Sequence, residues 1–324
     1  MNRLPLALPS GWYRVAGARD IAPGEVQPLH LFGEELIVFR GESGGVSVLD
    51  AYCAHLGAHI GHGGQVKGDD IVCPFHHWRY DATGQNVEIP YRERPHRAAR
   101  LRRWPTIERN GLVLAWYSAT GTEPAWEPPE LSEAVDPGYI CLEPPETEWD
   151  IRTHPQEVME NTVDIAHFRY VHGVTGFGAV ELIEDGPTLR SIASVTMQTG
   201  RGEVDGAIES ELWGLGLDVV RQRGIGDAAV LFSVTPVDEG LVRARYTFMV
   251  PRDGDGPSRY GQAVMREFCK QIVQDIPIWE HKRYRDRPKL AMGEGAIVDF
   301  RRWAEQFYEE PLEPARTGRA AVVA

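Results

Sequence analysis

The first third of the chain alternates short apolar runs with turn-forming residues. Glycines and the pair Asn110-Gly111 separate apolar runs at residues 36–39, 46–49, 71–72 and 112–116. Runs this short, bounded by residues that favour tight turns, are typical of β-strands joined by hairpins. We therefore predict an all-β domain over residues 1–125, with no helix of any length.

A stretch rich in proline and glutamate follows this domain. It includes the triplets Glu127-Pro128-Pro129 and Glu143-Pro144-Pro145. Proline lacks the amide donor that a helix interior or a central strand requires. The pattern predicts a connector over residues 126–145 and a second domain over residues 146–324.

The second domain opens with a helical pattern over residues 154–172. Pro155 suits its first turn and Gly173 suits its end. Runs that alternate or are apolar throughout predict strands, at residues 189–197, 206–212, 228–237 and 241–250.

A second helix is expected over residues 261–284, where apolar side chains recur at helical spacing. The order helix, strands, long helix predicts an α+β domain. Its antiparallel sheet would pack against the C-terminal helix and enclose an apolar cavity.

Composition and charge narrow the classes of protein. The chain has 324 residues, of which 42% are apolar and 25% charged, as expected for two globular domains. A net charge of -13 argues against nucleic-acid binding, because such proteins need a basic surface. No apolar run is long enough to span a membrane and no signal pattern opens the chain, so we expect a cytoplasmic protein.

Two loops of the first domain each carry one cysteine and one histidine. They are Cys53-Ala54-His55 and Cys73-Pro74-Phe75-His76, and each follows an apolar run. Two cysteines and two histidines can hold one zinc ion, or a Rieske [2Fe-2S] cluster in which histidines replace cysteines on one iron. Zinc sites commonly pair like residues within a loop, so the mixed order favours the Rieske interpretation.

The predicted helix carries a second group of metal-binding residues. Asp164 and His167 are three residues apart and share a helix face, and His172 near the helix end can turn toward the same point. Two histidines and one carboxylate form the facial triad of non-haem Fe(II) oxygenases. Taken alone, a histidine pair in a helix is also compatible with ordinary packing.

Together these motifs resemble those of Rieske-type non-haem iron oxygenases. Cys-Ala-His-Leu-Gly-Ala-His at residues 53–59 and Cys-Pro-Phe-His-His-Trp at residues 73–78 resemble the cluster loops, and the spacing from Asn161 to His172 resembles the catalytic domain. Respiratory Rieske proteins have a further cysteine in each loop, where this chain has Ala58 and Phe75. Residues 275–279 and 301–308 look like the branch that contains the 3-ketosteroid 9α-hydroxylase oxygenase component and the cholesterol 7-desaturases.

The resemblance implies a Rieske domain followed by a helix-grip catalytic domain, with a metal ligand at each motif position. The cluster ligands would be Cys53, His55, Cys73 and His76. The ligands of the mononuclear Fe(II) would be His167, His172 and Asp275. Because Pro277 can kink the late helix, Glu160 and Glu280 stay open as alternative carboxylates.

The resemblance also implies an assembly and a reaction. Asp164 would link a cluster histidine of one subunit to an iron histidine of the next in a head-to-tail homotrimer. Electrons from NAD(P)H would come through a separate ferredoxin reductase or ferredoxin, because the chain has no nucleotide-binding glycine motif.

The expected activity is that of a terminal oxygenase that uses O2 to hydroxylate a C–H bond of a hydrophobic, steroid-like polycyclic substrate. Desaturation, aromatic-ring dioxygenation and a plain Rieske electron-transfer role remain open. Apolar candidates for the substrate pocket, for each of which the sequence favours core packing over a pocket role, are Phe177, Trp213, Leu215, Leu217, Phe232 and Phe248.

Overall fold

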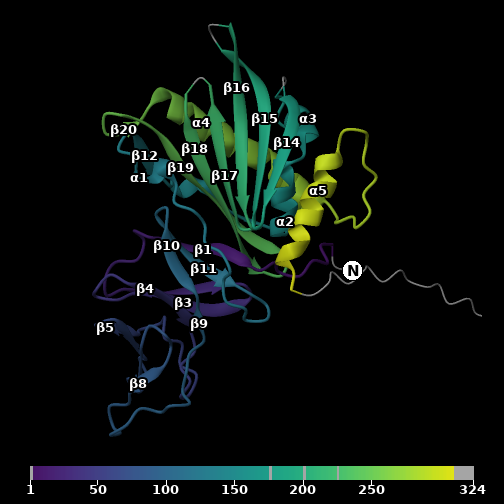
Figure 1. Ribbon diagram of the computed structural model, residues 1–324. Coiled ribbons are helices and arrows are strands. Elements are labelled where there is room, and N and C mark those ends of the chain that lie inside the picture. Colours follow the sequence, from purple (N-terminus) through teal and green to yellow (C-terminus); the bar gives the residue numbers. More distant parts are fainter. Residues whose placement is uncertain (1–2, 175–176, 200–201, 225, 310–324) are drawn as a thin grey trace, which may run out of the picture.

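The N-terminal part of the chain folds into three small antiparallel sheets, and the C-terminal part forms one large sheet with helices on one side (Figure 1). The structure is a computed structural model that describes residues 3–174, 177–199, 202–224 and 226–309. Within these residues no helix is long and apolar enough to cross a membrane.

The N-terminal sheets contain no helix within the described residues before Leu131, as predicted. One sheet has the order β1-β11-β10, the second β2-β3-β4-β9 and the third β5-β6-β7-β8. Their strands are β1 (Gly11–Gly17), β2 (Val26–Leu31), β3 (Glu34–Arg40), β4 (Val46–Asp50), β5 (Gln65–Lys67), β6 (Asp70–Val72), β7 (Arg79–Tyr80), β8 (Asn86–Glu88), β9 (Arg103–Trp104), β10 (Thr106–Arg109) and β11 (Leu112–Tyr117).

The central strand β3 explains why these sheets stay together. Its side chains from Leu36 to Phe39 are buried alternately in two clusters: Ile37 and Phe39 pack toward the β5–β8 sheet, and Leu36 and Val38 toward β1 and β11. Because successive side chains of a strand point to opposite faces, this one strand joins both cores.

The proline-rich stretch contains the short helix α1 (Ser132–Val135) and the strand β12 (Tyr139–Leu142). β12 pairs with β19, so the large sheet begins inside the stretch that follows the first domain.

The large sheet is antiparallel and runs in the order β12-β19-β18-β17-β16-β15-β14, with β13 and β20 also paired to β19. From β14 to β19 each strand pairs with the next one along the chain. The strands are β13 (Glu148–Ile151), β14 (Phe177–Asp185), β15 (Thr188–Thr199), β16 (Gly202–Trp213), β17 (Leu217–Arg223), β18 (Ala228–Asp238), β19 (Leu241–Asp253) and β20 (Gly256–Pro257).

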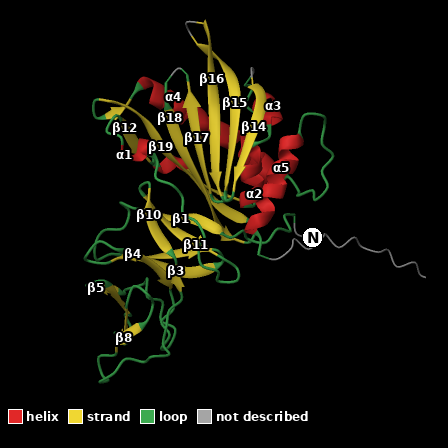
Figure 2. Cartoon of the chain, viewed as in Figure 1, coloured by secondary structure: helices red, strands yellow, loops and turns green. Residues whose placement is uncertain are grey.

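The helices of the second domain lie on one face of this sheet and at its β14 edge (Figure 2). α4 (Arg259–His281) is the long helix, and α2 (Pro155–Met159), α3 (Ile165–Tyr170) and α5 (Gly295–Ala304) are shorter. α4 buries Val264, Phe268, Ile272 and Trp279, a helical spacing that places one apolar stripe against the sheet. The predicted α+β class and the packing of sheet on long helix are confirmed.

The single helix predicted over residues 154–172 is wrong. α2 and α3 are separated by a 3-10 turn at Glu160–Thr162 and by Asp164, whose backbone is extended. The Asp164 side chain accepts a hydrogen bond from the amide of His167, so it caps a new helix. α4, by contrast, continues past Pro277, which lies on its exposed face.

Residues 3–10 run back along the second domain. The Arg3 guanidinium donates to the carbonyls of Trp279, Lys282 and Arg152 at the end of α4 and after β13. The Ser10 amide donates to the carbonyl of Phe307 beyond α5.

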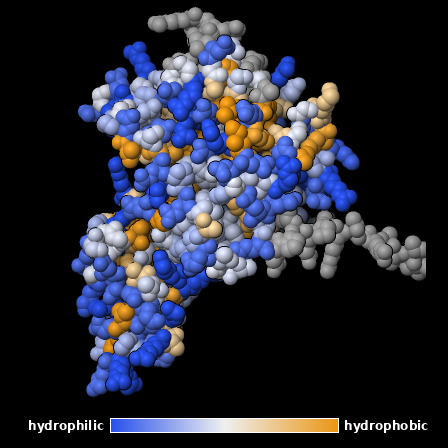
Figure 3. All heavy atoms as spheres, in the orientation of Figure 1, coloured by the Kyte–Doolittle hydropathy of each residue, from blue (hydrophilic) through white to orange (hydrophobic). Residues whose placement is uncertain are grey.

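In the view of Figure 3 most of the surface is hydrophilic, and apolar residues gather over the second domain near β14 and β15.

Candidate active site

The structure brings three residues from separate elements to one point. His167 lies on α3, His172 follows α3, and Asp275 lies on α4. Their nearest ligand atoms all lie within 4.8 Å of one another, and no other group of this kind occurs among the described residues. His172 Nε2 lies 3.4 Å from Asp275 Oδ2. The two histidines and one carboxylate therefore converge as a single metal ion requires.

The other nitrogen of each histidine ring is fixed by an oxygen. His167 Nδ1 donates to the backbone carbonyl of Asp164, and His172 Nδ1 lies 3.0 Å from Gln274 Oε1. An acceptor at Nδ1 keeps the proton there and leaves Nε2 free for a metal. Burial lowers the pKa of His167. Burial also opposes charge on His172, but the hydrogen bonds to Asp275 and Gln274 outweigh it and its pKa is raised.

Asp275 is a buried carboxylate whose surroundings suit a bound cation. Its residue is 7% exposed, and its one ion-pair partner in the described part of the chain is His172. His172 Nε2 carries no proton when it binds a metal, so a metal ion between these groups would then compensate the buried charge of Asp275. The alternative carboxylates are engaged elsewhere: Glu160 accepts two hydrogen bonds from Arg301, and Glu280 pairs with Arg152.

The cluster loops divide into a cysteine pair and a histidine pair. Cys53 and Cys73 are buried, unpaired thiols that share a hydrogen bond, which lowers the pKa of Cys53 to about 6. The rings of His55 and His76 lie 4.7 Å apart. A tetrahedral zinc ion would require the four residues to converge on one point, and they do not. Two separate pairs fit a cluster with one iron at each pair.

A polar atom without a partner marks the histidine side of these loops. His55 Nδ1 is buried and has no hydrogen-bond partner in the described residues. Its ring stacks on Trp78 at 4.4 Å, which fixes its plane. A buried, fixed and unpartnered nitrogen has the properties of a metal ligand. Tyr80, whose hydroxyl lies 3.1 Å from Cys53 Sγ, also belongs to this group.

A cavity of about 630 Å³ lies between the sheet and α4 and reaches the group of His167, His172 and Asp275. This volume is in the range of sites for small organic ligands. The exposed surface of its wall is mainly apolar, but many polar residues also line it, among them Asp218, whose pKa burial raises to about 6.

Of the apolar candidates for this pocket, Phe232 lines the cavity. Trp213, Leu215, Leu217 and Phe248 lie in the core with at most 1% exposure, so the core packing favoured from the sequence is confirmed for them. Trp213 and Leu217 pack toward Trp12 and the first domain. The side chain of Phe177 lies outside the described residues.

Sequence reasoning missed Gln274, Tyr80 and Asp218. An amide directly before a candidate ligand could have suggested Gln274. The other two gave no signal, because their contacts join residues 27 and 56 positions apart.

Comparison with known proteins agrees with both sites. The family model described as the Rieske [2Fe-2S] domain matches residues 11–108, and the one described as the 3-ketosteroid 9alpha-hydroxylase C-terminal domain matches residues 115–308. Cholesterol 7-desaturase nvd of Xenopus laevis is 32% identical, over 95% of this chain and 73% of its own length. A probable 3-ketosteroid-9-alpha-monooxygenase oxygenase component of Rhodococcus rhodochrous is also 32% identical, over 95% of this chain and 82% of its own length.

Solved structures share the fold. Dicamba monooxygenase bound to dicamba superposes with a TM-score of 0.73 at 19% identity, over 91% of this chain and 96% of the other. The QL mutant of NdmA from Pseudomonas putida CBB5 with caffeine gives 0.73 at 19% identity, over 91% and 89%. From the two matching domains and the extent of the likeness to curated relatives, the chain belongs to the Rieske non-haem iron monooxygenases, in the branch of the 3-ketosteroid 9α-hydroxylase oxygenase components and the cholesterol 7-desaturases.

Proposed function

We propose that this chain is the terminal oxygenase of a multicomponent system that hydroxylates a C–H bond of a steroid-like polycyclic substrate. The observation that carries the proposal is the mainly apolar cavity of about 630 Å³ that reaches His167, His172 and Asp275. Such a wall binds a ring system by shape and apolar contact. The named activity of the Rhodococcus rhodochrous relative favours hydroxylation, and that of the Xenopus laevis relative makes desaturation the second candidate.

We propose His167, His172 and Asp275 as ligands of Fe(II), and Cys53, His55, Cys73 and His76 as ligands of a [2Fe-2S] cluster. When bound, these groups supply electron transfer and O2 activation. The residues of the chain hold the ligand nitrogens in one tautomer through Gln274 and the Asp164 carbonyl, and the apolar wall keeps water away from the substrate.

We further propose a homotrimer in which the cluster loops of one subunit face α3 of the next. In one chain the β5–β8 sheet lies at the opposite end of the molecule from α3 (Figure 1). Both places expose apolar side chains: Leu56 is 66% and Phe75 59% exposed on the loops, and Tyr170 is 80% exposed on α3. Contiguous exposed apolar residues mark contact surfaces. Asp164, half-buried beside His167, would then hydrogen-bond a cluster histidine of the neighbouring subunit.

The electron donor in this proposal is a separate ferredoxin reductase or ferredoxin that draws on NAD(P)H. The name "oxygenase component" of the Rhodococcus rhodochrous relatives supports a divided system. A reducing, cytoplasmic setting is in line with four free cysteine thiols.

A single-turnover experiment tests the activity. Iron-loaded, chemically reduced protein is mixed with O2 and a panel of 3-ketosteroids, sterols and smaller polycyclic compounds, and the product masses are read. A gain of one oxygen on a steroid supports the hydroxylase, and a loss of two hydrogens supports the desaturase. If no steroid reacts but a mononuclear iron signal still responds to NO, the steroid assignment is wrong while the oxygenase remains.

A further inference from the structure

Tyr246 places a phenol hydroxyl in the cavity wall without a hydrogen-bond partner. The residue lies on β19, is 7% exposed and lines the cavity. Its hydroxyl takes part in no hydrogen bond within the described residues, whereas the hydroxyl of Tyr13 donates to the Pro9 carbonyl at 2.7 Å and that of Tyr80 lies 3.1 Å from Cys53 Sγ. The Tyr246 oxygen is not among the buried side-chain atoms that lack a partner, so it is accessible from the cavity that the residue lines. A hydroxyl that opens into a cavity and has no protein partner is free to donate to a bound ligand.

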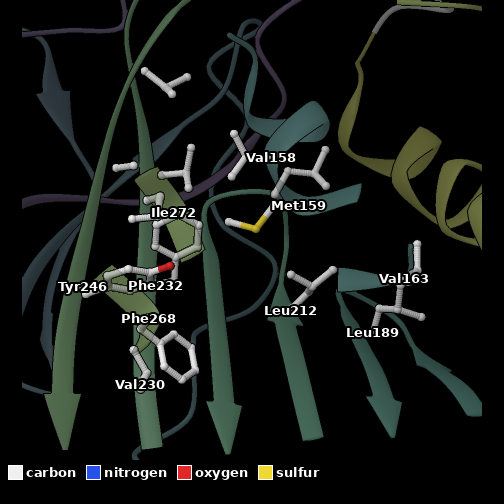
Figure 4. Packing of buried hydrophobic residues seen from close by; sticks show 14 of the residues in the cluster. Val158, Met159, Val163, Leu189, Leu212, Val230, Phe232, Tyr246, Phe268 and Ile272 are labelled. Atoms are coloured by element: carbon white, nitrogen blue, oxygen red, sulfur yellow. The ribbon is translucent and has the colours of Figure 1, made fainter. Parts of the chain in front are cut away.

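The neighbours of Tyr246 explain why no protein acceptor reaches it. Strand register places Asp218, Phe232 and Tyr246 in one row across β17, β18 and β19. The ring of Phe232 lies 4.7 Å from the Tyr246 ring, and that of Phe268 on α4 lies 5.7 Å away. In Figure 4 the Tyr246 oxygen is the one oxygen among the side chains drawn, next to Phe232. The Tyr246 ring is therefore packed between the aromatic rings of Phe232 and Phe268.

The two carboxylates near Tyr246 are already engaged. Asp275 pairs with His172, and Asp218 accepts from the hydroxyls of Ser210 and Thr162. Burial raises the pKa of the Tyr246 phenol well above its ordinary value, and the charges of Asp275 and Asp218 add to this. The phenol accordingly keeps its proton at neutral pH, and it is available as a hydrogen-bond donor.

We propose that the Tyr246 hydroxyl donates a hydrogen bond to a carbonyl oxygen of the substrate, and that this contact determines which ring system the cavity accepts. The inference rests on the proposed function, because it takes the cavity as the substrate site. A carbonyl has acceptor lone pairs and no proton, so it complements a donor that has no protein partner. A fixed donor on the cavity wall also selects which carbon faces His167 and His172.

The test compares dissociation constants of androstane and of its 3-keto and 17-keto derivatives. Binding is measured anaerobically on iron-loaded protein, so that it does not depend on turnover. The variants are Tyr246→Phe and, as a matched control, Tyr260→Phe. The Tyr260 hydroxyl already donates to the Gly226 carbonyl at 2.8 Å, so it has no free donor for a ligand.

We expect Tyr246→Phe to weaken the binding of one ketone about fivefold to tenfold and to leave androstane unchanged. Tyr260→Phe should leave the ratio of ketone to androstane affinity as in the wild type. Equal effects of Tyr246→Phe on ketones and hydrocarbon, or no effect, overturn the inference while single-turnover products still support the proposed function. Absence of both steroid binding and steroid products in the wild type overturns the proposed function, and the inference with it.

Discussion

Asp164 contributes to the site with its backbone and with its side chain. The backbone carbonyl holds His167 in one tautomer, and the carboxylate caps α3 through the His167 amide. Any substitution at this position therefore tests two separate roles. Asparagine caps helices about as well as aspartate, so it removes the negative charge while keeping the local fold.

We predict that Asp164→Asn retains both metals and the wild-type thermal stability but loses almost all turnover, because it removes the charge of the proposed link between subunits. Iron content, cluster absorption and product formation are measured on the same preparation. Asp164→Ala is the matched comparison and should also lose about 1 kcal/mol of stability with the cap. Normal product formation by Asp164→Asn would contradict the bridging role.

Asp218 predicts a pH dependence of stability. Burial raises its pKa to about 6, against the hydrogen bonds from Ser210 and Thr162, which lower it. Since the folded pKa lies above the unfolded one, the folded chain binds more protons between these values. Stability should therefore fall as pH rises from about 4 to about 6 and then level off, at a total cost of about 3 kcal/mol.

Asp218→Asn should remove this part of the pH dependence. Urea unfolding of both proteins at about pH 5 and about pH 7 measures the difference, and the variant should gain stability relative to the wild type at the higher pH. Identical pH profiles for the two proteins would show that Asp218 titrates normally in the folded chain.

At the residue scale, the spacing of residues in the sequence predicted the proposed metal ligands best where one short motif carries several of them. Cys53, His55, Cys73 and His76 lie in two short loops, and His167 and His172 lie five positions apart, so local pattern alone predicted their association. Asp275 needed the family resemblance, because more than 100 positions separate it from His172. The free hydroxyl of Tyr246 depends on what packs around it in three dimensions, which no local pattern contains.

At the scale of elements, α4 is tied to α2 by an ion pair between a half-buried lysine and a buried carboxylate. Glu157 on α2 is fully buried, and its Oε2 lies 2.8 Å from Nζ of Lys282 just beyond α4. Glu160 and Arg301 extend this charged group toward α5. The group fixes the end of the helix that carries Asp275.

We predict that Lys282→Met lowers the free energy of unfolding by about 3 kcal/mol or more, because it leaves the Glu157 carboxylate buried without a cation. Denaturant unfolding provides the measurement. Lys270→Met is the control, since the pair of Lys270 and Glu267 is exposed on α4 and should contribute less than about 1 kcal/mol. Equal losses in the two variants would show that the Glu157 carboxylate is not held as a buried charge.

The helices and strands were predicted best where apolar residues recur regularly over a long segment of the sequence. The strands β15, β16, β18 and β19 cover the predicted ranges, whereas β14 and β17 were missed. The helix α4 ends at His281, three residues before the predicted end at residue 284. The helix predicted over residues 154–172 is broken at Asp164, because the Asp164 side chain caps the start of α3 and its extended backbone does not continue a helix. Pro277 does not end α4, since its ring lies on the exposed face, next to solvent.

At the scale of the whole molecule, the separation of the β5–β8 sheet from α3 predicts complementation between subunits. A Cys73→Ser chain lacks a cluster ligand, and an Asp275→Ala chain lacks an iron ligand. In a homotrimer, the cluster of the second chain can serve the iron of the first. We expect each variant alone to be inactive and co-expressed variants to regain part of the wild-type turnover.

Light scattering of the purified mixture measures the expected trimer mass, and two different affinity tags select mixed assemblies. The Asp275→Ala chain alone should keep its cluster absorption while losing mononuclear iron. Mixed trimers without any turnover would contradict transfer between subunits.

The α+β class and the two-domain order were predictable from pattern and resemblance, but the contacts of residues 3–10 with α4 were not, because they join distant positions.

Those contacts have a consequence for how the chain emerges from the ribosome. Arg3 is synthesised 276 residues before Trp279 and 279 residues before Lys282, whose carbonyls accept its hydrogen bonds. At about 5–20 residues per second this interval is roughly 15–55 seconds, long enough for the Rieske domain to fold first. These hydrogen bonds therefore form only after the end of α4 has been synthesised, and they complete the catalytic domain.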